Sequence, residues 1–596
     1  KTIKPINLGG RLGGTKYIVQ NILFKFAVDE AGQYSDYTTA KIAGHELKGL
    51  ISFFNCRIEG LCLPLMCLVD YRGFRLIAMS ILPIRGSRTI VYGSDDYGET
   101  VHNEEPRMEA LVQRAARALN IKEHACGMVP ERSARLAGPA DLEGHAGVDG
   151  RLYLLDFSRV MPPETPRPGV RHAHLYRLLR PEFVKAYPRP LCSDAWSAFI
   201  ARHDYREDNR EIVEATEHLV GRHVPAFAEE LAQMMADGRE QVYSYSFRLT
   251  EAVHRRGINV RYLGVLRRHI ADPDCRTYIL VEMCARVVKN KLRKLLRRKM
   301  KELKVPLEDP YRRLVISYLN LVLGDSEVSD EYWNNNIKRA LGRKFVQAMT
   351  EEEQTVAYSL KSSLTNFSDD KMDGKLLLFL RLQKMTGLRF TARVNEEFSK
   401  NPNNWAPRGE QPLDETDLED IGLRVKHMNI VSHAQGFVLQ MKGAIAWGHD
   451  PVAAERFYHM AITKYEEALD TNPSDHKALI HCAEIAVHFI EGHSRAVAAM
   501  KYDWADPTVQ HANLLFQKAI QANPDSYCLF KYAQFLDKCN MPKEAEEMFL
   551  SSLEAEPESI DCLHEYGNFL SERGEHDMAE RFYMCGSEVV QKYSAW

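Results

Sequence analysis

Residues 526–557 read SYCLFKYAQFLDKCNMPKEAEEMFLSSLEAEP, and residues 560–586 read IDCLHEYGNFLSERGEHDMAERFYMCG. Small residues return at a fixed interval in this stretch: Ala533 and Ala545 are followed 34 residues later by Gly567 and Ala579. A similar series returns after 51 residues further upstream, where Ala461, Ala468 and Pro473 are followed by Ala512, Ala519 and Pro524. The C-terminal part of the chain therefore repeats one local structure.

A 34-residue period with small residues inside helical patterns is typical of tetratricopeptide repeats, each of which is a pair of antiparallel helices. The small residues are needed where the two helices cross, since a larger side chain would hold the helices apart. The sequence accommodates about three such repeats. The longer offset indicates an inserted loop or longer helices around residues 492–507. A stack of helix pairs forms a concave groove, so we expect this region to bind proteins or peptides.

The first 190 residues carry mixed strand and helix signals. The segment Asp70-Tyr71-Arg72-Gly73 separates two apolar runs and favours a hairpin turn, and Asp149-Gly150 favours another tight turn. Pro162–Pro168 is rich in proline, which cannot continue either element, so it marks the exit from this α+β domain. The predicted elements are strands over 62–69, 74–82 and 152–157 and helices over 39–54 and 108–119.

The rest of the chain has mostly helical periodicity. One long helix is predicted over 277–303, where apolar residues form a single stripe. The polar, turn-rich segment 401–412 is predicted to be a linker between helical blocks. We therefore divide the chain into an α+β domain over 1–190, a helical region with a basic helix over 191–345, a helical linker region over 346–450 and the tetratricopeptide-like α-solenoid over 451–596.

The formal charge of −3 hides a strong asymmetry along the chain. Residues 251–304 contain sixteen Lys and Arg against five Asp and Glu, whereas residues 451–596 contain twelve against twenty-four. Because the sign of the local field selects partners, the two regions are expected to contact different molecules.

The basic stretch is the candidate site for RNA or another polyanion. Such a density of cations is self-repulsive unless an anion balances it, and phosphate backbones are common polyanions. The competing interpretation is a solvated helix face that acidic neighbours neutralise, including the acidic repeats of the same chain. The candidate residues are Lys289, Lys291, Arg293, Lys294, Arg297, Arg298, Lys299 and Lys301.

Four carboxylates gather within sixteen residues at Asp141, Glu143, Asp149 and Asp156. Such a cluster at the mouth of a hairpin can hold Mg²⁺ and position a phosphate. Asp156-Phe157-Ser158 is similar to the Asp-Phe-Gly motif of kinases, but neither the His-Arg-Asp nor the Val-Ala-Ile-Lys motif is present. The four residues are therefore either candidate metal ligands of a phosphotransferase or a hydrogen-bonded turn with satisfied carboxylates.

Composition excludes several other classes of protein. The twelve cysteines form no C-x-x-C pair and are expected to be free buried thiols. The longest apolar region, 61–84, is broken by prolines and charged residues, so no membrane insertion is expected. The chain starts at Lys1 without a signal pattern, which suggests a piece of a longer protein. Neither a nucleophile elbow nor a zinc-binding helix motif occurs, so we assign no catalytic residue and no cofactor.

Six stretches occur in a fixed order: YIVQNILFKF at 17–26, VDYRGFRLIAMSILPI at 69–84, VYGSDDYGETVH at 91–102, DGRLYLLDFSRVMPP at 149–163, LRPEFV at 179–184 and RGINVRYLG at 256–264. The first five resemble the Clu domain of the clustered-mitochondria proteins, and the last resembles the helical region that follows that domain. The resemblance spans about residues 15–304. It implies an α+β Clu domain, a mostly α-helical region and, in this family, C-terminal tetratricopeptide repeats.

The resemblance also implies a function. Members of this family are cytoplasmic, non-enzymatic proteins that bind messenger RNAs for mitochondrial proteins and are associated with the translation initiation machinery. The resemblance supplies no catalytic residues. We therefore expect an RNA-associated scaffold that supports mitochondrial organisation and binds proteins through its repeats. The alternatives are a protein-interaction adaptor without RNA binding and a degenerate kinase-like phosphotransferase.

Overall fold

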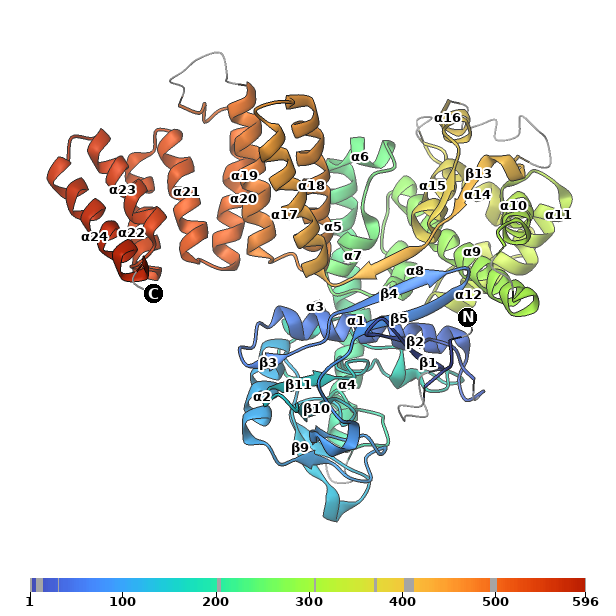
Figure 1. Ribbon diagram of the computed structural model, residues 1–596. Helices are drawn as coiled ribbons and strands as arrows, with labels where there is room; N and C mark the ends of the chain where they lie inside the picture. Colours follow the sequence, from blue (N-terminus) through green and yellow to red (C-terminus); the bar gives the residue numbers. More distant parts are fainter. Residues whose placement is uncertain are drawn as a thin grey trace. The chain divides into compact units, whose positions relative to one another are not determined.

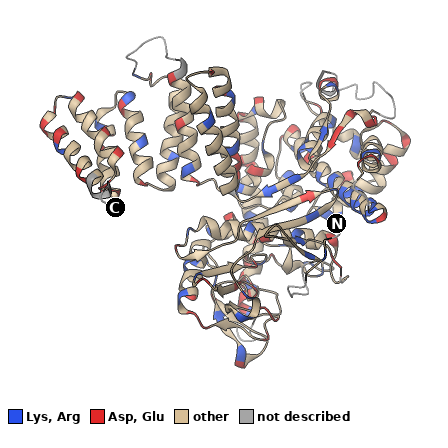
Figure 2. Ribbon diagram, in the orientation of Figure 1, with Lys and Arg blue, Asp and Glu red and all other residues tan. Residues whose placement is uncertain are grey.

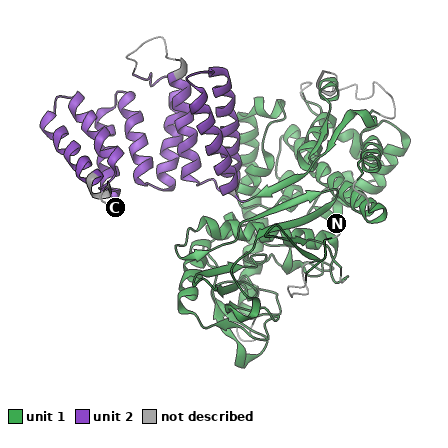
Figure 3. Cartoon of the chain, viewed as in Figure 1, with its two compact units in different colours: residues 1–427 green, residues 428–596 purple. Residues whose placement is uncertain are grey.

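The chain divides into two compact units, residues 1–427 and residues 428–596 (Figure 3). The structure is a computed structural model that describes residues 3–6, 14–30, 32–200, 205–304, 307–368, 372–400, 412–493 and 501–594. The linker predicted over 401–412 lies almost entirely outside the described residues. No helix in the described ranges is long and apolar enough to cross a membrane.

An antiparallel five-stranded sheet organises the first unit (Figure 1). Its order is β1-β2-β5-β4-β14, with β1 at Lys16–Val19, β2 at Ile22–Phe26, β5 at Phe74–Ser80, β4 at Met66–Tyr71 and β14 at Arg424–His427. The strand β14 lies more than 300 residues from β4 in sequence and still pairs with it, placing Arg424 opposite Asp70. The boundary between the compact units therefore falls after His427, and the sheet includes a strand from the segment predicted to be a helical linker.

The predicted hairpin between β4 and β5 is confirmed. Tyr71 pairs with Phe74, and the two turn residues Arg72 and Gly73 have φ values of 42° and 86°. Positive φ at both central residues gives the twist that antiparallel strands need. Gly73 is also required by packing, since a Cβ atom there would lie 2.3 Å from the Arg293 backbone oxygen.

Helix α1 (Asp36–Asn55) packs against β4 and β5. It begins where the Ser35 side chain accepts a hydrogen bond from the Thr38 backbone N–H, which caps the first turn. The second predicted helix is α2 (Pro106–Leu119), which has proline at its first position and ends at Asn120 in the left-handed conformation. Both helices confirm the predicted periodicity.

A second five-stranded sheet has the order β3-β11-β10-β6-β7. The turn at Asp149-Gly150 joins β10 to β11, as predicted, with Gly150 at φ 77°. Gly144 of β10 faces Tyr92, whose Cβ would lie 2.8 Å from an added Cβ. The strands are β3 at Leu61–Cys62, β11 at Leu152–Leu155, β10 at Glu143–Ala146, β6 at Ile90–Gly93 and β7 at His102–Asn103.

Helices dominate the rest of the first unit, around the 31-residue helix α9 (Pro273–Leu303). Asp272 caps its N-terminus by accepting a hydrogen bond from the Cys275 backbone N–H, and Lys304 ends it at φ 54°. The N-terminal half of α9 is buried, mainly against α15. The principal helices are α4 (Tyr205–His218), α5 (Val224–Asp237), α7 (Leu249–Arg255), α8 (Leu263–Arg268), α10 (Asp309–Leu323), α12 (Lys338–Lys344) and α15 (Gly374–Thr386).

The second unit is a series of antiparallel helix pairs (Figure 1). The pairs are α17 (Asn429–Ala446) with α18 (Pro451–Thr471), α19 (His476–His493) with α20 (Pro507–Ala522), α21 (Ser526–Lys538) with α22 (Pro542–Ala555) and α23 (Ile560–Glu572) with α24 (His576–Ser594). The predicted α-solenoid is thus present, with α17 added before residue 450. The predicted insertion falls between α19 and α20, but residues 494–500 lie outside the described part of the chain.

The repeated small residues occupy the helix crossings. Ala533, Ala545 and Ala579 are at most 2% exposed. Gly567 faces the ring of Tyr583, where an added Cβ would lie 2.5 Å from a ring carbon. Gly436 and Gly443 stand in the same relation to Tyr465 and Tyr458 of the first pair. Each pair can therefore close on a large ring only because the facing residue is small.

We predict that Gly567→Leu lowers the free energy of unfolding of the second unit by roughly 1–3 kcal/mol, because the new side chain overlaps the Tyr583 ring. Calorimetry of the full chain measures the effect. Gly448→Leu is the matched control, since no heavy atom lies within 4 Å of a Cβ at that position. Equal unfolding temperatures for the two variants would contradict the packing argument.

Candidate functional site

The eight cations predicted to bind a polyanion all lie on the C-terminal half of α9 (Figure 2). Helical geometry points them in different directions, because eight residues within thirteen positions must surround the helix. Lys294, Arg298 and Lys301 are exposed. The others are half-buried: Lys289, Lys291, Arg293, Arg297 and Lys299.

Two of the arginines hold α9 against strand β4 and helix α1. Arg293 lies 3.0 Å from the Asp70 carboxylate of β4, and Arg297 lies 3.0 Å from the carboxylate of Asp36 at the start of α1. Burial lowers the pKa of Arg293 to about 10, against the favourable charge of Asp70. The eight cations therefore do not form one continuous solvent-facing surface.

The outward cations have weaker partners. Arg298 lies 3.6 Å from Glu302 one turn later, with both side chains more than half exposed, and Lys301 lies 3.6 Å from Asp36. Exposed pairs of this kind contribute about 0–1 kcal/mol. In the described chain, every ion pair of the eight residues is with a carboxylate of the first unit.

The predicted acidic residues do not form one metal site. The Asp141 carboxylate accepts two hydrogen bonds from Arg159, at 2.8 and 2.9 Å. Asp149 accepts hydrogen bonds from the Tyr153 hydroxyl and the Arg151 backbone N–H and so stabilises the β10–β11 turn. Among the described residues, the groups whose ligand atoms lie within 4.8 Å of one another include none of the four predicted carboxylates.

Glu143 and Asp156 belong to a different cluster, which includes Glu46 of α1. The Glu46 carboxylate accepts a hydrogen bond from the Phe157 backbone N–H at 3.0 Å. Burial, together with the charge of Asp156, raises the pKa of Glu46 to about 8 and that of Glu143 to about 9. The charge of Lys25 on β2 acts in the opposite direction on both groups. Sequence reasoning missed Glu46 and Lys25, because neither stands near Asp156 in the chain.

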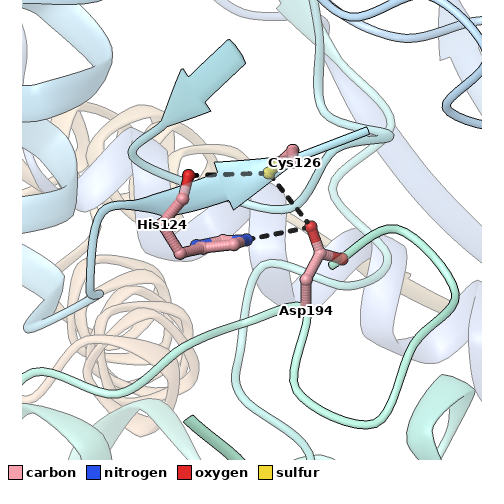
Figure 4. A group of neighbouring side chains, drawn as sticks. All are labelled: His124, Cys126 and Asp194. Atoms are coloured by element: carbon pink, nitrogen blue, oxygen red, sulfur yellow. Dashed lines mark hydrogen bonds and ion pairs between the residues drawn. The ribbon is translucent and has the colours of Figure 1, made fainter. Parts of the chain in front are cut away.

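A buried polar group that the sequence did not indicate lies between β8 (His124–Cys126) and the loop containing Asp194 (Figure 4). The His124 Nε2 lies 3.0 Å from the Asp194 Oδ2, and the Cys126 thiol lies 3.6 Å from the same oxygen. All three residues are at most 2% exposed. Imidazole, thiolate and carboxylate are zinc ligands, so their identities match a metal site.

The surrounding contacts favour a structural network. Besides His124, Asp194 Oδ2 accepts the Ala140 backbone N–H at 2.8 Å, and Oδ1 accepts a hydrogen bond from Arg159 at 2.6 Å. Burial alone would raise the pKa of Asp194, but Arg159 and His124 hold it well below its usual range. Burial also raises the pKa of Cys126 to about 12, which disfavours the thiolate that binds metals. Arg159 thereby links Asp141 to Asp194 through one buried guanidinium.

We predict that Asp194→Asn lowers the free energy of unfolding by roughly 3–5 kcal/mol at neutral pH, because Arg159 and His124 keep buried charges without their counter-charge. The pKa of Asp194 is lower in the folded protein than in the unfolded chain, so its carboxylate stabilises the fold at any pH above the unfolded-state pKa. This contribution is lost on acidification. The difference in unfolding free energy between the variant and the unmodified protein should therefore shrink below about pH 4. Thermal unfolding at several pH values measures it. Asp149→Asn is the control, because Asp149 is an exposed turn residue. If both variants lost the same unfolding free energy, the buried network around Asp194 would have no special role in stability.

Two solved structures show a distant likeness to part of this chain. The structure described as "Crystal structure of MamA" shares 14% identity, covers 28% of this chain and 85% of its own, and has a TM-score of 0.20. Yeast Tom70 shares 13% identity, covers 65% of this chain and 74% of its own, and also has a TM-score of 0.20. At TM-scores this low the two structures do not establish the fold, so the solenoid is assigned from the helix pairs of this chain.

Two family models match the first unit. The model described as Clustered mitochondria matches residues 1–166, and the model described as Translation initiation factor eIF3 subunit 135 matches residues 245–402, which include α9.

Curated relatives carry the first of these names. The Clustered mitochondria protein homolog of Homo sapiens is 32% identical over 195 residues, covering 29% of this chain and 15% of the relative. The Clustered mitochondria protein of Arabidopsis thaliana is 34% identical over 158 residues, covering 26% of this chain and 11% of the relative. The homolog from Aspergillus fumigatus is 24% identical over 379 residues, covering 50% of this chain and 28% of the relative. The chain thus spans less than a third of each relative's length. The resemblance is confirmed: the chain carries the Clu domain and is a relative of the clustered mitochondria proteins.

Proposed function

We propose that the protein is a non-enzymatic, RNA-associated scaffold of the cytoplasm that supports mitochondrial organisation. The curated relatives supply the mitochondrial part of this proposal through their printed names. The match of residues 245–402 to a translation initiation factor subunit supports contact with messenger RNA and the translation machinery. The observation that carries the RNA proposal is the exposed group Lys294, Arg298 and Lys301 on the rigid helix α9.

These cations suit the RNA backbone rather than the bases. The segment 289–304 contains no aromatic residue on which a base could stack. Lysine and arginine side chains on an exposed helix face bind phosphates, release counterions and read little sequence. The proposed interaction is therefore weak, dependent on salt and largely independent of RNA sequence. Selection of particular messenger RNAs falls to protein partners.

The second unit supports protein binding. Its first helix, α17, exposes several large apolar side chains, which monomeric proteins rarely gather on one helix without a partner. Phe437 is 45% exposed and Ile445 is 70% exposed. Val438 and Met441 add to this face, at 55% and 46%. We propose that the tetratricopeptide-like repeats recruit proteins or peptides, while α9 contacts RNA. In the adaptor alternative, the repeats bind proteins but α9 does not bind RNA.

We predict that Lys294→Gln combined with Arg298→Gln weakens the binding of single-stranded oligouridine and reduces the slope of log affinity against log salt by roughly 1.4, or about 0.7 for each lost phosphate contact. Arg297 is left unchanged because its pair with Asp36 holds the fold together. Fluorescence anisotropy over a salt series measures the slope.

Lys518→Gln combined with Lys543→Gln is the matched control for this experiment, because it removes two exposed cations from the acidic repeats with the same change in net charge. It should leave both affinity and slope unchanged. Two results count against the proposal: an unchanged slope in the α9 variant, and no oligouridine binding by the unmodified chain. The second result, together with retained protein partners in a pull-down, would favour the adaptor alternative.

Phosphate binding beside Glu46, Glu143 and Asp156, which we call the acidic cluster, is the second candidate function, and the nearby charge of Lys25 favours it. In protein kinases a strand lysine contacts the nucleotide phosphates and pairs with a helix glutamate, and the aspartate before phenylalanine binds the Mg²⁺ ion. We predict that Asp156→Asn abolishes Mg²⁺-dependent ATP binding measured by calorimetry, whereas Asp149→Asn retains it, because Asp149 serves the turn. The candidate fails if the unmodified protein binds no ATP.

A further inference from the structure

A second group of cations lies where α1, α9 and β14 of the first unit converge. Its members are close enough for each to lower the pKa of others through repulsion. Four lysines form its centre, and we call them the basic cluster: Lys41 and Lys48 of α1, Lys289 of α9 and Lys426 of β14.

The Asp70 carboxylate holds one side of the frame around these lysines. It accepts hydrogen bonds from Arg75 of β5 at 2.7 Å and from Arg293 of α9 at 3.0 Å. Arg75 also donates to the Ala40 carbonyl at 2.9 Å, next to Lys41 on α1. Because Arg424 pairs with Asp70 across the strands, Lys426 lies two positions further along β14 on the same face. The sheet, α1 and α9 are thus fixed relative to one another.

Arg286 holds the other side. It lies 2.9 Å from Glu282 one turn earlier on α9, and it donates to the Thr250 hydroxyl of α7 at 2.8 Å. Its backbone carbonyl accepts a hydrogen bond from the Lys344 Nζ of α12 at 2.9 Å. Arg286, Lys289 and Arg293 follow the three- and four-residue spacing of one helix face.

The carboxylates of this frame are already in use. Asp70 serves two arginines, and Glu282 serves both Arg286 and Arg381. None of the ion pairs within 4.0 Å in the described part of the chain involves the four lysines of the basic cluster; the charge of Glu182 acts on Lys48, but its carboxylate is paired with Arg180 at 2.6 Å. The centre of the convergence is therefore an excess of positive charge, which an anion from outside the chain would balance.

The four lysines are both desolvated and accessible. Burial, followed by the repulsion of neighbouring cations, lowers the pKa of Lys41 and of Lys426 to about 7 and that of Lys48 and Lys289 well below the usual value. Lys41 and Lys426 nevertheless remain exposed to solvent, and the other two are half-exposed. Such unpaired cations cost free energy in the empty protein.

We propose that the basic cluster is a binding site for a compact polyphosphate, distinct from the outward RNA-binding face of α9. Its lysines come from three separate elements, α1, α9 and β14, instead of from one helix ridge, which suits several phosphates on one small scaffold better than an extended strand. Lys41 also lies 5.6 Å from the ring of Tyr37, so an aromatic side chain stands at the edge of the cluster. Inositol polyphosphates and linear polyphosphates share the chemistry required.

Calorimetry of the full chain in EDTA, with inositol hexakisphosphate and inorganic tripolyphosphate as separate probes, tests this proposal. EDTA removes Mg²⁺ and so keeps the acidic cluster from contributing. We expect binding of at least one probe. A stronger response to the hexakisphosphate indicates a ring-mounted ligand, and a stronger response to tripolyphosphate indicates a linear one. No binding of either probe to the unmodified protein would overturn the proposal.

Lys48→Gln combined with Lys289→Gln should weaken probe binding roughly tenfold or more, because each ammonium makes charge-assisted contacts with phosphate. Neither lysine has an ion pair within 4.0 Å in the described chain, and unpaired cations cost free energy in the empty protein, so the variant should unfold at the same temperature or a higher one. Lys294→Gln combined with Arg298→Gln is the matched control and should retain the probe while losing RNA. If the inner variant binds the probe normally, or loses oligouridine and probe in parallel, the separate site does not exist.

Proton uptake gives a readout that needs no variant. Lys41 and Lys426 are partly neutral in the free protein at pH 7, and an anion favours their charged forms. Probe affinity should therefore fall by roughly tenfold or more from about pH 6 to about pH 8, with net proton uptake in buffers of different ionisation enthalpy. An affinity independent of pH would count against the cluster as the binding site. The charged and titratable groups around Lys41 and Lys426 are Tyr37, His45, Lys48, Asp70, Arg75, His254, Arg261, Arg286, Lys289, Lys344 and Arg424.

Discussion

The carboxylate of Asp70 connects the sheet of the first unit to the long helix α9. It accepts hydrogen bonds from Arg75 on the neighbouring strand and from Arg293 on the helix, and Arg424 of β14 stands opposite it in the strand register. Its surroundings are strongly cationic, so removal of this single negative charge would leave three arginines facing one another. The relative placement of the sheet, α1 and α9 depends on this pairing, and with it the direction in which each cation of α9 points.

Charge on α9 therefore serves two purposes on one helix. Arg293 and Arg297 hold the helix against β4 and α1, and their charges are used within the protein. Lys294 and Arg298 project into solvent, where phosphates can reach them. The inner lysines stand between these cases, because they are neither paired nor fully solvated. A dense run of basic residues therefore indicates polyanion binding only through those members that are not paired with carboxylates of the same protein. Acidic residues deeper in the domain are also used within the protein, since Asp141 and Asp194 both accept hydrogen bonds from Arg159.

Local patterns predicted most elements of the fold. The turn at Arg72-Gly73 acts within a few residues of itself, and the alanines and glycine of the repeats recur at a fixed interval, so both signals are visible in the sequence. Long-range pairing left no such signal. The strand β14 joins a sheet whose other members end at Ser80, and Glu46 meets Phe157 across more than a hundred residues. The buried group around His124 and Asp194 was missed for the same reason, since its members are ordinary residues until the fold brings them together.

The amino-acid sequence alone determined the repeat period, the charge asymmetry, the hairpins and the order of motifs that identifies the Clu domain. Each of these depends on spacing or composition, which the chain carries whether folded or not. Only the tertiary structure decided which basic side chains are held by Asp36 and Asp70, which reach solvent and which converge without a counter-charge. Electrostatic interactions depend on distance and solvation in three dimensions, and a linear sequence contains neither quantity.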